Sequence, residues 1–341
     1  MSSDGQARQD IVVGVSIALT LISVIIVSLR IYTRAFIVRN VGKDDLSMIA
    51  ALLFTLAFVA ILLVLRANQM GFSDKSMTLA QMITTVKANI AISIVYYLCV
   101  NAVKISILIF YLRIAVEKTF ERICKATIYL LAIFCAVCII VVFTQCMPLS
   151  KRWDFTHSPQ GKCINGPAFM YMVSAINILA DIWILILPIK VLLGIQRPGR
   201  EKIALIAVFA LGIFSCIASI IRLNSVRLWV QSEQPFLDSV PISLFSMVEI
   251  NIGIWCASIP ALKALFSKTL RERSQHTSGY QYHGSERSGE AGGSGARRAG
   301  KGFGSIIKDE EFVLETVHGE SAGGGAESAS GSRERIVQNQ V

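Results

Sequence analysis

Seven long apolar stretches, separated by short polar segments, dominate the chain from residue 11 to residue 266. At about 1.5 Å of helical rise per residue, each stretch reaches or nearly reaches across the roughly 30 Å of hydrocarbon in a bilayer. The pattern therefore predicts an all-α fold, a seven-transmembrane helix bundle. The predicted helices cover residues 11–29, 46–65, 90–112, 126–143, 168–193, 203–223 and 241–266.

The composition indicates an integral, multi-pass membrane protein. Charged residues make up only 16% of the chain, against about a quarter in soluble domains. The net charge of +10 comes from Lys and Arg residues scattered through short loops and a Gly/Ser tail, without a basic helix interleaved with aromatic residues. We therefore expect membrane lipid as a partner and no nucleic acid. Helices of these lengths fit either the plasma membrane or an internal membrane.

The loops after the first, third and fifth predicted helices are short and basic, and by the positive-inside rule they face the cytoplasm. This orientation places the N-terminus outside, with residues 1–10 as a short extracytoplasmic segment and residues 11–268 as the transmembrane domain. No cleavable signal is expected, because the first ten residues lack a basic n-region. The basic loop residues are Arg30, Arg34, Arg39, Lys43, Arg113, Lys118, Arg122, Lys125, Lys190, Arg197, Arg200 and Lys202.

From residue 269 to residue 341 the chain is polar and rich in Gly and Ser. Such a composition cannot bury a core, so we expect a disordered cytoplasmic tail. One patch within it, residues 306–317, mixes apolar and acidic residues. This patch is either a docking motif for a cytoplasmic signalling partner or a segment without a role.

Few ionisable residues lie within the apolar stretches, and a charge in hydrocarbon is rare unless it faces the bundle interior and finds a partner. Helical rise places Lys104 and Asp181 at similar depths, so we expect them to pair. Tyr97 and Asn101 share the predicted face of Lys104, and Asn177 shares that of Asp181. The pair serves either as a structural link between helices or as part of a ligand site.

Arg222 and Glu249, on the sixth and seventh predicted helices, form a second expected pair. They either pack the helices together or line an outward-facing polar pocket capped by the Trp153 loop. Asp181 and Glu249 are also candidate catalytic acids. Pro188 and Pro260 are expected to kink the fifth and seventh helices. The candidate ligand-binding residues are Asn101, Lys104, Trp153, Asn177, Asp181, Arg222 and Glu249.

Cys146 and Cys163 lie in the predicted outer loop, where oxidation is possible. They either form a disulfide that ties this loop over the mouth of the bundle or remain two free thiols. The other cysteines lie in or beside the helices and are expected to act as small apolar fillers. No histidine-ligated metal site is expected, because every histidine lies in a loop or in the tail: His157, His276, His283 and His318.

A set of short motifs is spread over residues 10–270. They are Gly42-Lys43-Asp44-Asp45, the run from Lys104 to Arg113, Gln145-Cys146-Met147-Pro148 with Trp153 and Cys163, the run from Asn177 to Asp181, Leu187-Pro188, Arg222, and Glu249 with Ser258-Ile259-Pro260. As a set, these motifs resemble the fungal rhodopsin-like seven-transmembrane family, which includes the satratoxin-cluster membrane protein and the receptor-like pathogenicity sensors. The resemblance implies a fungal membrane protein that is receptor-like by fold or encoded within a secondary-metabolite cluster.

Two departures limit what the resemblance implies. Retinal proteins need a lysine in the middle of the last helix, whereas this helix has only Lys263, near its end. We therefore expect no retinal and no other cofactor. In addition, Tyr111-Leu112-Arg113 occupies the place of the acidic-Arg-Tyr motif of animal receptors, so coupling to a G protein is only an analogy of fold.

The sequence favours a receptor-like sensor associated with secondary metabolism, which would bind a small lipophilic ligand or metabolite. The alternative is a membrane-embedded enzyme, an isomerase or cyclase, that uses Asp181 or Glu249 as a proton donor to a lipophilic metabolite. A transporter is less favoured, because the chain has no internal repeat and no broken helix pair around a midplane site. A scaffolding role for pathway enzymes is a further alternative.

Overall fold

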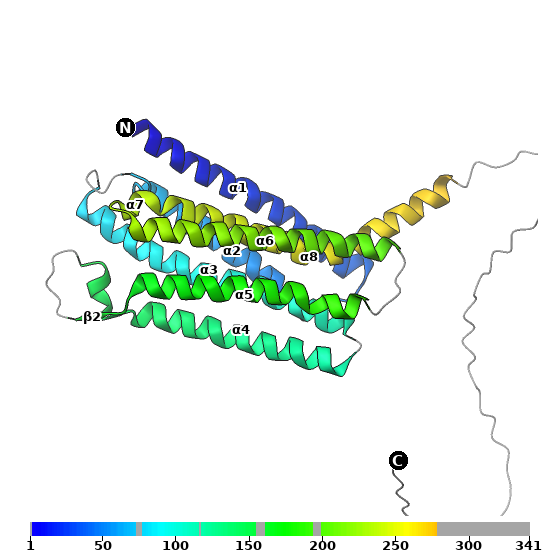
Figure 1. The fold of residues 1–341 in the computed structure, drawn as a ribbon. Coiled ribbons are helices and arrows are strands. Elements are labelled where there is room, and N and C mark those ends of the chain that lie inside the picture. The colour runs from blue at the N-terminus through cyan, green and yellow to red at the C-terminus, as the bar shows by residue number, and fades with distance from the viewer. Residues whose placement is uncertain (1, 73–76, 116, 155–160, 194–198, 278–341) are drawn as a thin grey trace, which may run out of the picture. The chain divides into compact units, whose positions relative to one another are not determined.

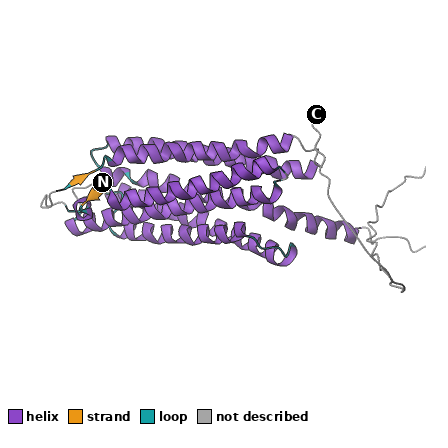
Figure 2. Cartoon of the chain, turned by 90° about the horizontal axis from the view of Figure 1, so that it is seen from below, coloured by secondary structure: helices purple, strands orange, loops and turns teal. Residues whose placement is uncertain are grey.

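The computed structural model describes residues 2–72, 77–115, 117–154, 161–193 and 199–277. Within these ranges the chain is almost entirely helical, and Figure 2 shows two short strands beside one end of the helices. Seven of the described helices are long and apolar enough to cross a membrane, which confirms the predicted seven-helix fold. The helices are α1 (Ser2–Tyr32), α2 (Lys43–Ala67), α3 (Leu79–Ile114), α4 (Lys118–Thr144), α5 (Gly166–Leu193), α6 (Gly199–Gln231), the short α7 (Pro235–Asp238) and α8 (Val240–Thr277).

The bundle has two ends. α2, α4 and α6 all finish at one end of the bundle, which we call the disulfide end. They begin at the opposite end, which we call the Asp44 end (Figure 1). A five-residue π-helix, η1 (Thr33–Ile37), continues α1 at the Asp44 end. The predicted orientation in the membrane stays a prediction, because the helices alone do not define a cytoplasmic side.

Most helices extend further than the apolar pattern predicts. α3, for example, begins at Leu79, where Thr78 and Gln81 form a capping box: the Thr78 hydroxyl accepts from the Gln81 amide, and the Gln81 side chain accepts from the Thr78 amide at 2.9 Å. Such reciprocal bonds satisfy backbone groups at the first turn, so a helix can begin among polar residues. Apolar periodicity marks only the part of a helix that hydrocarbon surrounds.

The first and last helices extend past the predicted bounds of the transmembrane domain, which stay a prediction. Residues 1–10 were expected to precede the first helix, whereas α1 begins at Ser2 and its apolar span begins at Gln9. α8 continues to Thr277, past the expected start of the tail at residue 269, because the Leu, Arg, Glu and Gln residues of this segment are good helix formers. The rest of the predicted disordered tail, with the 306–317 patch, lies outside the described residues.

α8 lies at the centre of the bundle. About two thirds of its most apolar window is buried, against 22% for α4. Its residues Met247, Ile250 and Ile254 belong to the main apolar cluster, which also contains residues of α1, α2 and α3. α4 instead exposes large apolar side chains such as Tyr129, as expected for a surface that faces lipid. Polar residues on α8 are therefore in the interior of the protein.

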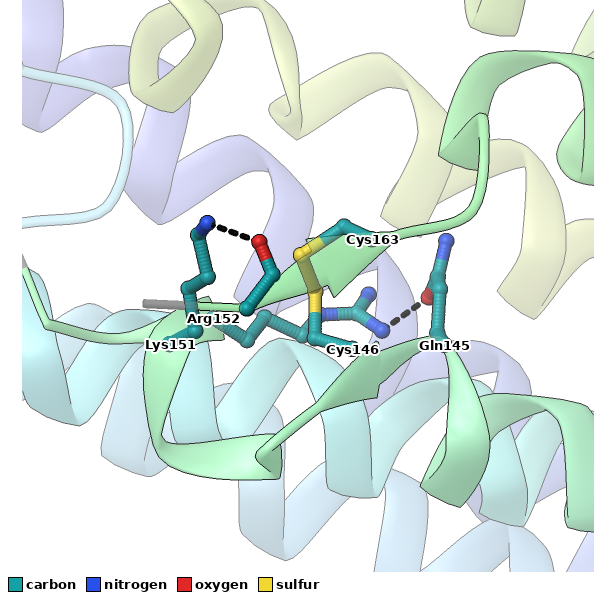
Figure 3. The surroundings of a disulfide bond; sticks show 6 residues. Gln145, Cys146, Lys151, Arg152 and Cys163 are labelled. Atoms are coloured by element: carbon teal, nitrogen blue, oxygen red, sulfur yellow. Dashed lines mark hydrogen bonds between the residues drawn. A yellow bond between two sulfur atoms is a disulfide. The ribbon is translucent and has the colours of Figure 1, made fainter. Parts of the chain in front are cut away.

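A small cap covers part of the disulfide end. Its strands β1 (Cys146–Met147) and β2 (Lys162–Cys163) pair antiparallel, and the short helix η3 (Leu149–Arg152) lies between them in the chain. A disulfide joins Cys146 to Cys163, the first of the two alternatives that the sequence left open (Figure 3). Because β1 follows α4 and β2 precedes α5, the disulfide links these two transmembrane helices.

Candidate functional site

Two buried ion pairs lie in the middle of the bundle. Lys104 Nζ on α3 is 3.0 Å from Asp181 Oδ1 on α5, and Arg222 Nε on α6 is 3.2 Å from Glu249 Oε2 on α8. Both pairings were expected from the sequence, the first from matching depth and the second from the reach of the arginine side chain. Every one of these side chains is at least 86% buried, the most exposed being Asp181 at 14%. Such charges are stable in an apolar interior only when they compensate each other.

Asn177 connects the two ion pairs. Lys104 Nζ donates to the side-chain oxygen of Asn177 at 2.6 Å and to its backbone oxygen at 2.9 Å. The Asn177 amide in turn donates to Glu249 Oε1 at 2.6 Å. A cation on α3 is thereby joined to a carboxylate on α8 through a neutral side chain on α5.

Tyr96 is a member of this group that the sequence analysis missed. Its hydroxyl lies 2.9 Å from both carboxylate oxygens of Glu249, and the guanidinium of Arg222 lies 4.5 Å from its ring centroid. The sequence analysis selected Tyr97 instead, which packs against the apolar cluster of α4 and α5 that includes Phe169. The four-residue spacing of positions 96, 100 and 104 was the available signal, since it places Tyr96 above Lys104 on one face.

Two serines complete the set. Arg222 donates through Nη2 to Ser174 Oγ at 3.2 Å, and Ser219 Oγ donates to Asp181 Oδ2 at 3.3 Å. Each serine precedes a predicted site residue on its own helix by three positions, the spacing of helical neighbours. We call the whole set the central network: Tyr96, Lys104, Ser174, Asn177, Asp181, Ser219, Arg222 and Glu249.

A cavity of about 50 Å³ borders the central network. Lys104, Asp181 and Glu249 form its charged wall, and most of the other lining residues are apolar. One water needs roughly 10–15 Å³ by this measure, whereas pockets for small ligands have roughly 300–1,000 Å³. In this conformation the cavity therefore has room for a few waters and none for a metabolite.

The cavity lies on the side of the network opposite to that predicted. Its lining on α3 runs from Val100 to Tyr111, so it extends toward the Asp44 end and not toward the cap. Trp153, the predicted cap of a pocket, instead has the Lys87 ammonium 5.3 Å from its ring centroid and packs beside the cluster that contains Phe169. Loop residues follow no helical period, so sequence alone does not fix the position of Trp153.

Asn101 also lies apart from the central network. Its amide donates to the backbone oxygen of Tyr97 on its own helix at 3.1 Å, and its side-chain oxygen is buried without a hydrogen-bond partner among the described residues.

In the cap, Arg152 donates to the side-chain oxygen of Gln145 (Figure 3). Burial lowers the pKa of Arg152, an effect that the Tyr97 phenol opposes. A ligand-binding role for all seven candidate residues stays a prediction.

A second group of buried charges lies at the Asp44 end. Arg30 on α1 donates to Asp44 at 2.8 Å and to Asp45 at 2.9 Å, and Arg113 on α3 donates to Asp44 at 3.1 Å. Arg34 lies beside the same carboxylates. We call these residues the end cluster: Arg30, Arg34, Asp44, Asp45 and Arg113.

The sequence analysis assigned the arginines of the end cluster to cytoplasmic loops, because they follow the apolar stretches. In the structure Arg30 is 1% exposed and also donates to the backbone oxygen of Ala257 on α8.

No group of three or more His, Cys, Asp or Glu side chains that could hold a metal occurs within the described part of the chain.

This geometry defines a class of protein: a multi-pass membrane protein with compensated charges at the centre of seven helices. The chain belongs to the fungal rhodopsin domain family, whose sequence profile matches residues 29–268. This match confirms the resemblance inferred from the motifs.

Three relatives show sequence similarity to the chain. The chain is 27% identical to Receptor GIN3 of Arthrobotrys oligospora over 75% of its own length and 62% of that protein. It is 33% identical to a SAT4 family membrane protein of Emericella nidulans over 52% and 44% of the two chains, and 28% identical to the Wortmanamides biosynthesis cluster protein C of Talaromyces wortmannii over 71% and 66%. The chain thus spans less than two thirds of the first two relatives. No solved structure matches it.

Proposed function

We propose that this protein is a receptor-like membrane sensor that works without retinal and responds to a lipophilic ligand carrying a polar group. The observation that carries the proposal is the wall of the cavity, where Lys104, Asp181 and Glu249 are set among apolar side chains. Such a surface suits a molecule with an apolar body and a polar group. The apolar body would replace apolar contacts between the helices, and the polar group would take the place of one hydrogen-bond partner within the central network.

The size of the cavity supports sensing. Because about 50 Å³ is too small for a metabolite, a ligand can enter only if the surrounding helices move apart. Binding then favours the open arrangement over the closed one, and this difference in affinity is what shifts a conformational equilibrium.

The central network supplies contacts that such a movement would exchange. Its ion pairs and hydrogen bonds cross between α3, α5, α6 and α8, so displacement of one helix changes the partners of the other three. α8 also contains Pro260, which lacks the amide hydrogen that would bond to the carbonyl of Cys256. A helix weakened at this position can bend at lower cost than an uninterrupted one.

Retinal does not suit this site. The membrane span of α8, Phe236–Leu262, contains no lysine. The lysine that lines the cavity, Lys104, lies on α3 and is paired with Asp181. We expect no visible absorption band when retinal is added to the purified protein; a band that Lys104→Met abolishes would contradict this part of the proposal.

The relatives support a sensing role connected with secondary metabolism, since one is named a receptor and another a biosynthesis cluster protein. The alternative, an isomerase or cyclase that uses Asp181 or Glu249 as a proton donor, requires the same opening of the cavity and, in addition, a substrate that is consumed. Turnover therefore separates the two functions.

The test compares cells that carry the wild-type protein, no protein, or Asp181→Asn at matched protein level. We expect pathway transcripts to change in the last two strains without accumulation of a pathway precursor. Asp10→Asn, which alters an exposed pair with Arg66 at the disulfide end, is the matched control and should behave as wild type. A precursor that accumulates while transcripts stay constant would replace the sensor with an enzyme or a transporter.

A further inference from the structure

The two aspartates of the end cluster have no free carboxylate oxygen. Asp44 Oδ1 accepts from Arg113 Nη1 at 3.1 Å, and Asp44 Oδ2 accepts from Arg30 Nη2 at 2.8 Å. Asp45 Oδ1 accepts from Arg30 Nε at 2.9 Å, and Asp45 Oδ2 accepts from the Gly42 amide at 3.0 Å. All four oxygens are therefore engaged at hydrogen-bond distance before Arg34 is considered.

Arg34 is a further cation facing carboxylates that are already engaged. Its Nη2 lies 3.6 Å from Asp44 Oδ2 and its Nε lies 3.8 Å from Asp45 Oδ1, the same two oxygens that Arg30 holds more closely. The side chain of Arg34 is 11% exposed, and its Nε is buried without a hydrogen-bond partner among the residues that the structure describes. A guanidinium in this position retains donor capacity for a further acceptor, and an anion would also compensate its charge.

The chain folds back over Arg34 after the π-helix. The Asn40 amide donates to the backbone oxygen of Arg34 at 3.1 Å, and Arg113 donates to the Asn40 side chain at 2.8 Å. Arg39 adopts a left-handed backbone, with φ 52°, which is uncommon for a residue other than glycine and occurs often at ligand sites. This path brings the exposed Arg39 and Lys43 to the same end of the bundle as Arg34.

The charges at this end are unequal. Residues 30–45 contain four basic residues, namely Arg30, Arg34, Arg39 and Lys43, and two acidic ones, and Arg113 adds a fifth positive charge. Arg34 also lies near the end of the first membrane span, Gln9–Ile37, and hence close to the level of lipid headgroups. The region thus combines excess positive charge with a guanidinium whose two carboxylate neighbours, at 3.6 and 3.8 Å, are held more closely by another arginine.

We infer that Arg34, assisted by Arg39 and Lys43, forms a binding site for a phosphate group. A phosphate offers several acceptor oxygens in the geometry that the guanidinium fork matches. The source of the phosphate is either the headgroup of an anionic membrane lipid or a free phosphate. This site is separate from the central network and does not depend on the proposed function.

The experiment uses the purified full-length protein in nanodiscs of phosphatidylcholine with and without phosphatidic acid, and counts retained lipids by native mass spectrometry. We expect phosphatidic acid to be retained in preference to phosphatidylcholine. Arg34→Gln should weaken this retention about tenfold, the effect of losing one charge-assisted contact. Equal retention of the two lipids by the wild-type protein, or full retention by Arg34→Gln, would overturn the inference.

Two further variants keep the test decisive if Arg34→Gln does not fold. Arg39→Gln combined with Lys43→Gln alters exposed side chains and leaves the buried ion pairs in place, so it should fold and still lose several-fold in retention. Arg66→Gln, an exposed arginine at the disulfide end, should change nothing. If the double variant retains phosphatidic acid as the wild-type protein does, the inferred phosphate site at Arg34, Arg39 and Lys43 is contradicted.

A competition with inorganic phosphate identifies the source. Displacement of phosphatidic acid by millimolar inorganic phosphate supports a site for free phosphate. Failure of inorganic phosphate to displace a lipid that still depends on Arg34 supports a site for a lipid headgroup.

Discussion

The central network and the end cluster contain the same kinds of group and use them differently. In the end cluster Arg30 meets residues only 14 and 15 positions away in the chain, and no carboxylate oxygen is left without a close donor. In the central network the partners are 27 to 153 positions apart, on four helices, beside a cavity. The first arrangement fixes the junction of α1 and α2. The second connects the helices that the proposed function requires to move relative to one another.

The largest effect is expected at the end cluster. Asp44→Asn removes the charge that holds both Arg30 and Arg113, and an uncompensated buried charge costs about 3–5 kcal/mol. Chemical unfolding in detergent should show this loss, whereas Asp10→Asn in the exposed pair should cost about 0–1 kcal/mol. Equal effects of the two substitutions would remove the distinction between a buried anchor and a surface pair.

A smaller and reversible effect is expected in the central network. Lys104→Met leaves Asp181 without its cation and should cost about 3 kcal/mol, because one buried charge loses its compensation. Adding Asp181→Leu should recover most of this loss, since apolar side chains of similar volume often replace a buried pair without cost. The measurement is a double-mutant cycle of unfolding free energies. Additive losses in the double variant would show that the charges stabilise the bundle and would weaken the comparison.

The smallest effect is expected from Gly212→Ala beside the cavity. The added Cβ would lie 2.7 Å from Leu185 Cδ2, the far end of a flexible side chain that lines the cavity and can turn into it. Alanine also favours the helix by about 1 kcal/mol over glycine, which offsets the displacement. The unfolding free energy should therefore stay within about 1 kcal/mol of wild type. A loss above about 2 kcal/mol would mean that α5 and α6 are packed too rigidly to open.

Much of the fold and of the central network could be predicted from the sequence. Apolar stretches predicted the seven helices because hydrocarbon imposes a minimum length on each span. Depth along the helices predicted the pair of Lys104 with Asp181, and the reach of an arginine side chain predicted the pair of Arg222 with Glu249. Spacings of three, four and seven residues select a broad face of a helix, so Tyr97, seven positions before Lys104, was selected in place of Tyr96, eight positions before it. Arg30 and Arg34 were assigned to a loop because apolar periodicity ends before the helix does.

The central claim is that the charges of the central network serve the response to a ligand more than the stability of the fold. The most direct measurement is the pathway transcript response of cells that carry Lys104→Met with Asp181→Leu, at wild-type protein level. The account predicts a folded protein that no longer changes these transcripts. A normal transcript response from this variant would contradict it.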